Sequence, residues 1–259
     1  MVTSIQKNNK YKTNCPRISW ADKKEITMVR KPVRKSRTKP VRRSSITWHK
    51  IMSKYSQGVI IINGHRGEGK SALGWDLAQK IHQKTKKPVS ALGLPRTVRE
   101  HFPKRGFGKG GIQFVNSINQ VNKMKPSIII LDEASFIANS RDAMSKDNKG
   151  WLKLIAICRH KDHLLIFIHQ QSRQLDIQIM MDADLVLLKR PTQLHLRGAR
   201  AEFKPEIQEA YALFENMRGD TRKKVYAIDY HYGKKAMLQA SMPTWWGNKV
   251  SKAYSSVSI

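Results

Sequence analysis

Residues 59–71 read VIIINGHRGEGKS, an apolar, β-branched run that breaks into a glycine-rich loop ending in Lys-Ser. The spacing is that of the P-loop motif G-x-x-x-x-G-K-[ST], in which consecutive backbone N–H groups curl into a nest for an anion. The β-branched residues before the loop favour a strand, and the Ser-Ala-Leu sequence after it favours a helix whose positive dipole end points at the same anion. A chain built around this segment is therefore constrained to an α/β fold. The alternative to an anion-binding loop is that the glycines form only a structural turn.

The motif predicts a nucleotide site with ATP and Mg²⁺ as ligands. Lys70 is expected to reach the β and γ phosphates, and the Ser71 hydroxyl is expected to bind Mg²⁺. The expected nucleotide-binding residues are those of the whole loop: Gly64, His65, Arg66, Gly67, Glu68, Gly69, Lys70 and Ser71.

A pair of acids, Asp132 and Glu133, directly follows the apolar run at 127–131. Ligands of parallel sheets gather at the carboxyl ends of the strands, where this pair is expected to lie. Asp132 is predicted to hold the Mg²⁺ hydration shell opposite Ser71, and Glu133 to orient and deprotonate the attacking water. The alternative is that the acids only cap the next helix.

A third apolar run, residues 164–168, ends in the polar sequence His-Gln-Gln-Ser-Arg. Gln170 would lie beside the γ phosphate if this strand is inserted between the P-loop strand and the Asp-Glu strand, so it is the candidate sensor; a solvated strand end is the alternative. His169 is expected to be structural. Arg159, and as second choice Arg173, is the candidate for an arginine presented to a neighbouring subunit, with a surface or nucleic-acid contact as the competing interpretation.

Strands and helices are expected to alternate along the chain, which predicts a mostly parallel α/β sheet with helices on both faces. Three regions are predicted: a basic arm at 1–45 without regular structure, an ATPase core at 46–200, and a C-terminal extension at 201–259 packed on the core. The expected strands are 59–62, 89–92, 112–115, 127–131, 164–168, 185–188 and 225–230, with helices at 48–55, 72–81, 151–158 and 207–214.

The chain of 259 residues carries 49 Lys and Arg against 19 Asp and Glu, a formal net charge of +30. Such an excess predicts a polyanionic partner, with nucleic acid first and an anionic membrane surface second. No apolar stretch approaches the roughly 20 residues of a spanning helix, and the first residues lack the apolar region of a signal peptide. The two cysteines, Cys15 and Cys158, have no metal-ligand spacing, so an intracellular, reducing location is expected.

The joint pattern of the P-loop, IIILDEAS at 128–135 and RHKDHLLIFIHQQSR at 159–173 resembles the additional-strand, catalytic-glutamate (ASCE) class of P-loop ATPases, which have a RecA-like core. An arginine ahead of a strand that ends in glutamine is similar to the HerA/FtsK-type DNA-pumping motors. That group includes viral genome-packaging ATPases and the Zot-like (zonular-occludens-toxin-like) phage ATPases. The resemblance covers about residues 59–190, and His169 stands where a small hydroxyl residue is usual.

The resemblance implies an ATP-driven motor that translocates double-stranded DNA as a homo-oligomeric ring, most simply for viral genome packaging. Lys70, Ser71, Asp132, Glu133 and Gln170 inherit nucleotide, Mg²⁺, water-activating and sensor roles from it. A capsid portal or vertex protein is a further expected partner. The alternatives are a Zot-like virion-assembly or secretion ATPase and a non-catalytic nucleic-acid-binding protein. The sequence leaves three roles open for the Trp245-Trp246 pair: a docking anchor, a base-stacking platform and core closure.

Overall fold

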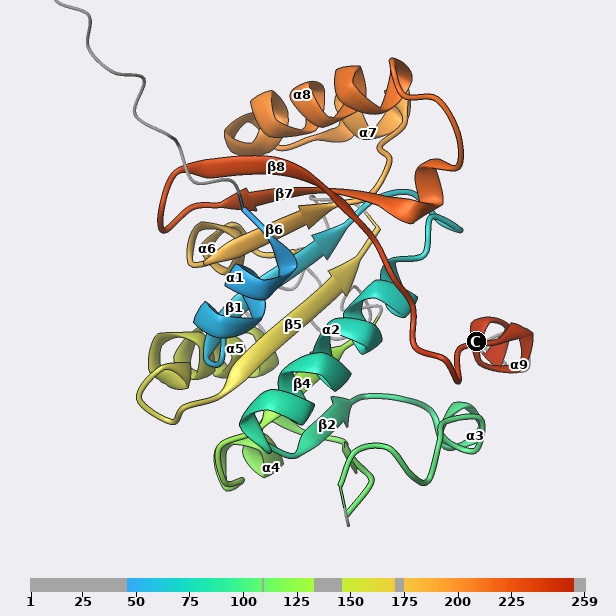
Figure 1. Ribbon diagram of the computed structural model, residues 1–259. Helices are drawn as coiled ribbons and strands as arrows, with labels where there is room; N and C mark the ends of the chain where they lie inside the picture. Colours follow the sequence, from blue (N-terminus) through green and yellow to red (C-terminus); the bar gives the residue numbers. More distant parts are fainter. Residues whose placement is uncertain (1–45, 109, 133–145, 171–174, 254–259) are drawn as a thin grey trace, which may run out of the picture. The chain divides into compact units, whose positions relative to one another are not determined.

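An eight-stranded mixed sheet forms the centre of the computed structural model, which describes residues 46–253 apart from 109, 133–145 and 171–174 (Figure 1). The strand order is β3-β2-β4-β5-β1-β6-β7-β8; the first six strands run parallel, β7 pairs antiparallel with β6, and β8 pairs antiparallel with β7. The strands are β1 (Gly58–Asn63), β2 (Val89–Leu92), β3 (Ile112–Val115), β4 (Ile128–Leu131), β5 (Leu164–His169), β6 (Leu185–Leu188), β7 (Lys224–Asp229) and β8 (Lys234–Gln239).

Helices cover both faces of this sheet, which explains why its central strands are apolar without interruption. Ile60 and Ile62 of β1 face a core shared with α1 (Trp48–Lys54), α2 (Lys70–Thr85) and α9 (Asn248–Ser251). Val59 and Ile61 face the opposite core. The helices that contribute to this second core are α4 (Ile118–Asn122), α5 (Lys146–Cys158), α6 (Ile177–Met181) and α8 (Lys204–Glu215).

Strand β5 lies between β1 and β4, although it follows both of them in the sequence. Leu164 at its start is in register with Gly58 of β1 and with Ile128 of β4. All three strands are parallel, so their carboxyl ends meet at one edge of the sheet. The insertion on which the expectation for Gln170 depended is therefore present in the fold.

The C-terminal part of the chain continues the sheet, and residues Ser44–Ile259 form one compact unit. Strand β7 pairs with β6, with Leu185 opposite Asp229. The expected strand at 225–230 is thus observed, whereas β8 was not expected because its sequence, KKAMLQ, is half polar and it forms the edge of the sheet.

Trp245 closes the core on the α2 face. Its ring lies 6.1 Å from Trp75 and 5.9 Å from Phe102 between centroids, and its Nε1–H donates to Gln79 Oε1 at 3.2 Å. This packing agrees with the core-closure interpretation of the tryptophan pair.

The other helices that the sequence did not indicate are short: α3 (Arg96–Arg99), α4, α6, α7 (Gln193–Gly198) and α9. None exceeds six residues, too few for a helical period to be recognised. The single turns Ala201–Phe203 and Thr221–Lys223 are 3₁₀ helices. Within the described ranges, no helix is both long and apolar enough to cross a bilayer.

Candidate nucleotide-binding site

The loop at 64–69 joins the carboxyl end of β1 to the amino end of α2. Gly69, the residue that caps α2, has a left-handed backbone (φ 81°) and offers no side chain to the first-turn N–H groups. Only glycine adopts this conformation without strain. The first backbone N–H groups of this 16-residue helix face the loop, and the side chain of residue 69 does not cap them. An anion site requires such uncapped N–H groups.

The Lys70 side chain is buried, with 6% of its surface exposed. Its ammonium group donates a hydrogen bond to the His65 carbonyl at 3.0 Å, so the side chain folds back over the loop. The positive charge therefore lies within the concave side of the glycine-rich turn, in the place where phosphates would bind.

Ser71 and Asp132 meet across the sheet edge. The Ser71 hydroxyl donates to Asp132 Oδ1 at 2.9 Å, and Asp132 is 7% exposed. A hydroxyl and a carboxylate are hard oxygen donors, and Mg²⁺ characteristically takes one or two carboxylates together with substrate phosphates. Among the described residues no cluster of three or more His, Cys, Asp or Glu could hold a metal by itself. The pair thus fits an ion that arrives with a nucleotide.

The carboxyl ends of β1 and β5 are joined by a buried side-chain contact. Asn63 Nδ2 lies 3.0 Å from His169 Nδ1, and the two residues are in register across the strands. The amide can only donate through this atom, which assigns His169 Nδ1 as the acceptor. The next residue, Gln170, is half-buried at the same edge. The structure thus brings Gln170 to the edge that holds the P-loop and Asp132.

Solved structures with this fold include viral DNA-packaging enzymes. The DNA-packaging ATPase B204 of Sulfolobus turreted icosahedral virus matches with a TM-score of 0.53 and 13% identity, over 71% of this chain and 98% of that one. The chain shares the fold of a genome-packaging ATPase.

Two further structures match at similar levels. The packaging NTPase B204 of Sulfolobus turreted icosahedral virus 2, in complex with ATPγS, gives a TM-score of 0.54 at 12% identity over 73% and 99% of the two chains. The conjugation coupling protein TcpA of pCW3, with ATPγS, gives 0.50 at 11% over 71% and 60%. No protein-family model and no curated protein matches the chain.

His195 contacts both Gln170 and the P-loop, although the sequence did not suggest it. Its Nδ1 accepts the Thr192 backbone N–H at 3.3 Å, so its Nε2 carries the proton and donates to the Gln170 carbonyl at 2.9 Å. Its ring also lies edge-on to that of His65 in the P-loop, 5.5 Å between centroids. Burial is the main cause that lowers the pKa of His195, and the nearby His65 and Lys70 add to it. The sequence carries no local signal of this contact, because His65 lies 130 residues before His195 in the chain.

Arg159 lies at the opposite end of the sheet. Its guanidinium pairs with Asp184, whose Oδ2 accepts the N–H of Val59 near the start of β1 at 2.9 Å. Strand β1 has six residues, which at about 3.3 Å each puts roughly 20 Å between Arg159 and the P-loop of the same chain. Arg159 therefore cannot act on its own nucleotide. Glu133 and Arg173 lie outside the described residues.

Proposed function

We propose that the chain is an ATP-hydrolysing motor of the RecA-like ASCE class that translocates double-stranded DNA and packages a viral genome. The observation that carries the proposal is the Ser71–Asp132 hydrogen bond of 2.9 Å at an edge where β5 is inserted between β1 and β4. A P-loop followed by a helix, a strand followed by Asp132, and an intervening strand followed by Gln170 supply the parts of a nucleotide-hydrolysing site. The fold shared with packaging ATPases supports the direction of the assignment.

Each residue has a distinct task in hydrolysis. Lys70 and the backbone N–H groups of the loop hold the β and γ phosphates. Ser71 and Asp132 would hold Mg²⁺, which when bound offsets negative charge on those phosphates. Glu133 accepts a proton from water as the water oxygen bonds to the γ phosphorus, and the bond from that phosphorus to the bridging oxygen breaks. Gln170 reports the presence of the γ phosphate to the strand that carries it.

The remoteness of Arg159 from its own P-loop supports a role in trans, within a homo-oligomeric ring. An arginine supplied by a neighbouring subunit stabilises charge on the transferring phosphoryl group and is worth about 10³–10⁵ in rate. The ion pair with Asp184 would hold this side chain near the amino end of β1, where it would face the neighbouring subunit.

The net charge of +30 supports DNA as the substrate of movement, since basic side chains track phosphates without reading sequence. In this proposal residues 46–200 are the ATPase core, 201–259 extend it, and the basic arm at 1–45 grips phosphates. A capsid portal or vertex protein would be the docking partner of the ring.

The test is an ATPase assay with and without duplex DNA, run beside a mass measurement of the assembled species. Wild type should be stimulated by DNA. Lys70→Ala should abolish turnover by removing phosphate binding, and Glu133→Gln should retain ATP but hydrolyse it at least about 100-fold more slowly, because the general base is lost. Lys84→Ala, an exposed lysine in the last turn of the same helix, is the matched control and should behave as wild type. Turnover that survives both site substitutions would refute the proposal.

A further inference from the structure

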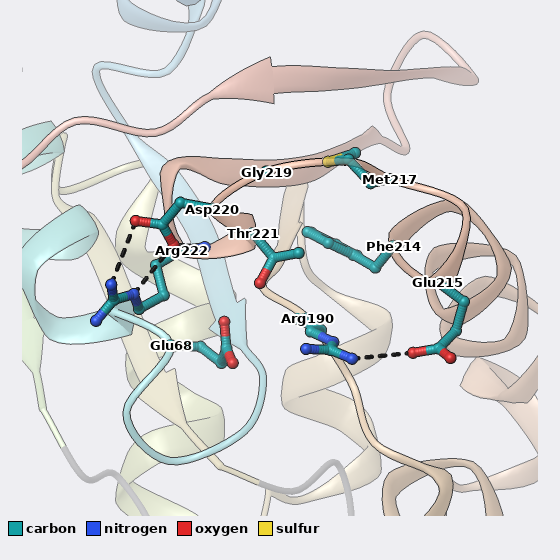
Figure 2. Close-up of a pocket in the computed structure, with 9 residues that line it drawn as sticks. All are labelled: Glu68, Arg190, Phe214, Glu215, Met217, Gly219, Asp220, Thr221 and Arg222. Atoms are coloured by element: carbon teal, nitrogen blue, oxygen red, sulfur yellow. Dashed lines mark hydrogen bonds and ion pairs between the residues drawn. The ribbon is translucent and has the colours of Figure 1, made fainter.

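A cavity of about 420 Å³ adjoins the P-loop and has not been assigned a role above. Pockets that bind small molecules commonly measure about 300–1,000 Å³. Figure 2 shows side chains from three parts of the chain around it: Glu68 of the loop, Arg190 after β6, and the segment that runs from the last turn of α8 to β7. The lining residues of that last segment are Phe214, Glu215, Met217, Gly219, Asp220, Thr221 and Arg222.

The cavity and the Ser71–Asp132 pair lie on opposite sides of the P-loop. The neighbours of β1 in the sheet are β5 on one side, with β4 and Asp132 beyond it, and β6 on the other, with β7 beyond it. Arg190 follows β6, and the segment at 219–222 leads into β7. A triphosphate whose metal-binding end points toward Asp132 therefore directs its other end, which carries the ribose and base, toward the cavity.

The charges of the lining favour a nucleoside over further phosphates. Two ion pairs form part of the wall, Arg190 with Glu215 at 3.1 Å and Arg222 with Asp220 at 3.0 Å (Figure 2). The carboxylate of Glu68 is a third acid, and both guanidinium groups of the lining are already paired, so these side chains offer no unpaired guanidinium group to a further phosphate. Planar guanidinium groups stack readily on aromatic rings, which suits a base.

Glu68 itself points to a ligand that donates hydrogen bonds. Its Oε2 is buried and has no hydrogen-bond partner among the residues that the structure describes. An ionised carboxylate can only accept, and a buried acceptor without a donor is costly. The two hydroxyl groups of a ribose are donors of the right kind, and acidic residues accept from ribose hydroxyls in other nucleotide sites.

We propose that this cavity binds the ribose and base of the nucleotide, and that Glu68 accepts hydrogen bonds from the ribose hydroxyls. The proposal rests on the proposed function, because it takes ATP as the ligand of the P-loop. It adds that the site selects ribonucleotides over 2′-deoxyribonucleotides through a residue that the P-loop motif leaves variable.

The first test compares ATP with 2′-deoxy-ATP by isothermal titration calorimetry on the full-length chain. Wild type should bind ATP about 10-fold more tightly, since a hydrogen bond to a charged group is worth about that factor or more. In Glu68→Ala the preference should vanish because ATP affinity falls to that of the deoxynucleotide. Glu100→Ala, an exposed glutamate outside the cavity, is the control and should keep the preference. Equal binding of the two nucleotides by wild type, or a preference that survives in Glu68→Ala, overturns the assignment of Glu68.

The second test fills the cavity with Thr221→Phe and adds inorganic tripolyphosphate as a probe of the P-loop alone. ATP affinity should fall at least about 10-fold, as large a change as the expected preference for ATP over 2′-deoxy-ATP. Tripolyphosphate affinity should stay unchanged. An unchanged ATP affinity in this variant overturns the placement of the nucleoside but leaves the proposed function intact. If neither ATP nor tripolyphosphate binds to wild type, the proposed function itself fails, and the two failures are thus distinguishable.

Discussion

Replacement of Asp184 by alanine should destabilise the fold far more than loss of its ion-pair partner. The Asp184 carboxylate has two contacts: Oδ2 accepts the Val59 N–H at 2.9 Å, and Oδ1 pairs with the Arg159 guanidinium. Asp184 has 9% of its side chain exposed, whereas Arg159 has 57%. The first contact is therefore buried and the second is largely in water.

The magnitudes follow from this difference in burial. In Asp184→Ala the buried Val59 N–H loses its acceptor, at a cost of about 1–3 kcal/mol. The exposed ion pair adds about 0–1 kcal/mol, because water and salt screen it. The sum, about 1–4 kcal/mol, is a large fraction of the 5–15 kcal/mol that keeps a domain folded. Asp184→Asn keeps an oxygen for the N–H, so it should cost only the ion pair, as should Arg159→Ala.

Urea denaturation monitored by circular dichroism measures these costs, as a lower midpoint at constant slope. The expected order of destabilisation is Asp184→Ala well above Asp184→Asn and Arg159→Ala, with Asp182→Ala, an exposed acid two residues earlier, as the neutral control. The reasoning is refuted if Arg159→Ala destabilises as much as Asp184→Ala, or if the asparagine variant is no better than the alanine variant.

Three more outcomes are expected from the geometry. Gly64→Ala should abolish ATP binding, because at φ 153° its new Cβ would lie 2.6 Å from the Cβ of Lys189. Calorimetry measures this loss, and binding at the wild-type level would contradict the clash. Burial lowers the pKa of His163, whose Nδ1 accepts the Ser127 N–H. The folded state therefore binds fewer protons than the unfolded state, and the free energy of unfolding should fall as pH drops below about 6.5. His163→Asn should flatten that acid limb in a series of urea melts, and an unchanged limb would exclude His163 as its source. Arg159→Ala subunits mixed with Lys70→Ala subunits should recover part of the ATPase rate if the arginine acts in trans, whereas no recovery at any ratio argues against it.

Some features of the fold could be predicted because their signals are local. Unbroken apolar runs predicted the four parallel strands β1, β4, β5 and β6, because a strand covered on both faces has few polar positions. The P-loop was readable for a similar reason, since its glycines and its Lys70-Ser71 pair are consecutive in the chain. Strand β8 and the short helices were not predicted, because a half-polar edge strand and a helix of one turn carry no distinctive period.

The sequence by itself determined which groups are available for chemistry. These are a glycine-rich loop at 64–71 whose backbone can surround phosphates, and the acid Asp132 directly after an apolar strand. Tertiary structure alone decided which groups meet. It inserted β5 between β1 and β4, brought Asp132 to 2.9 Å from Ser71, and set His195 against Gln170. It also paired Arg159 with Asp184 at the far end of the sheet and left Glu68 facing a cavity. These outcomes depend on the order in which strands pack, and side chains separated by 25 residues or more along the chain carry no local signal of their contact.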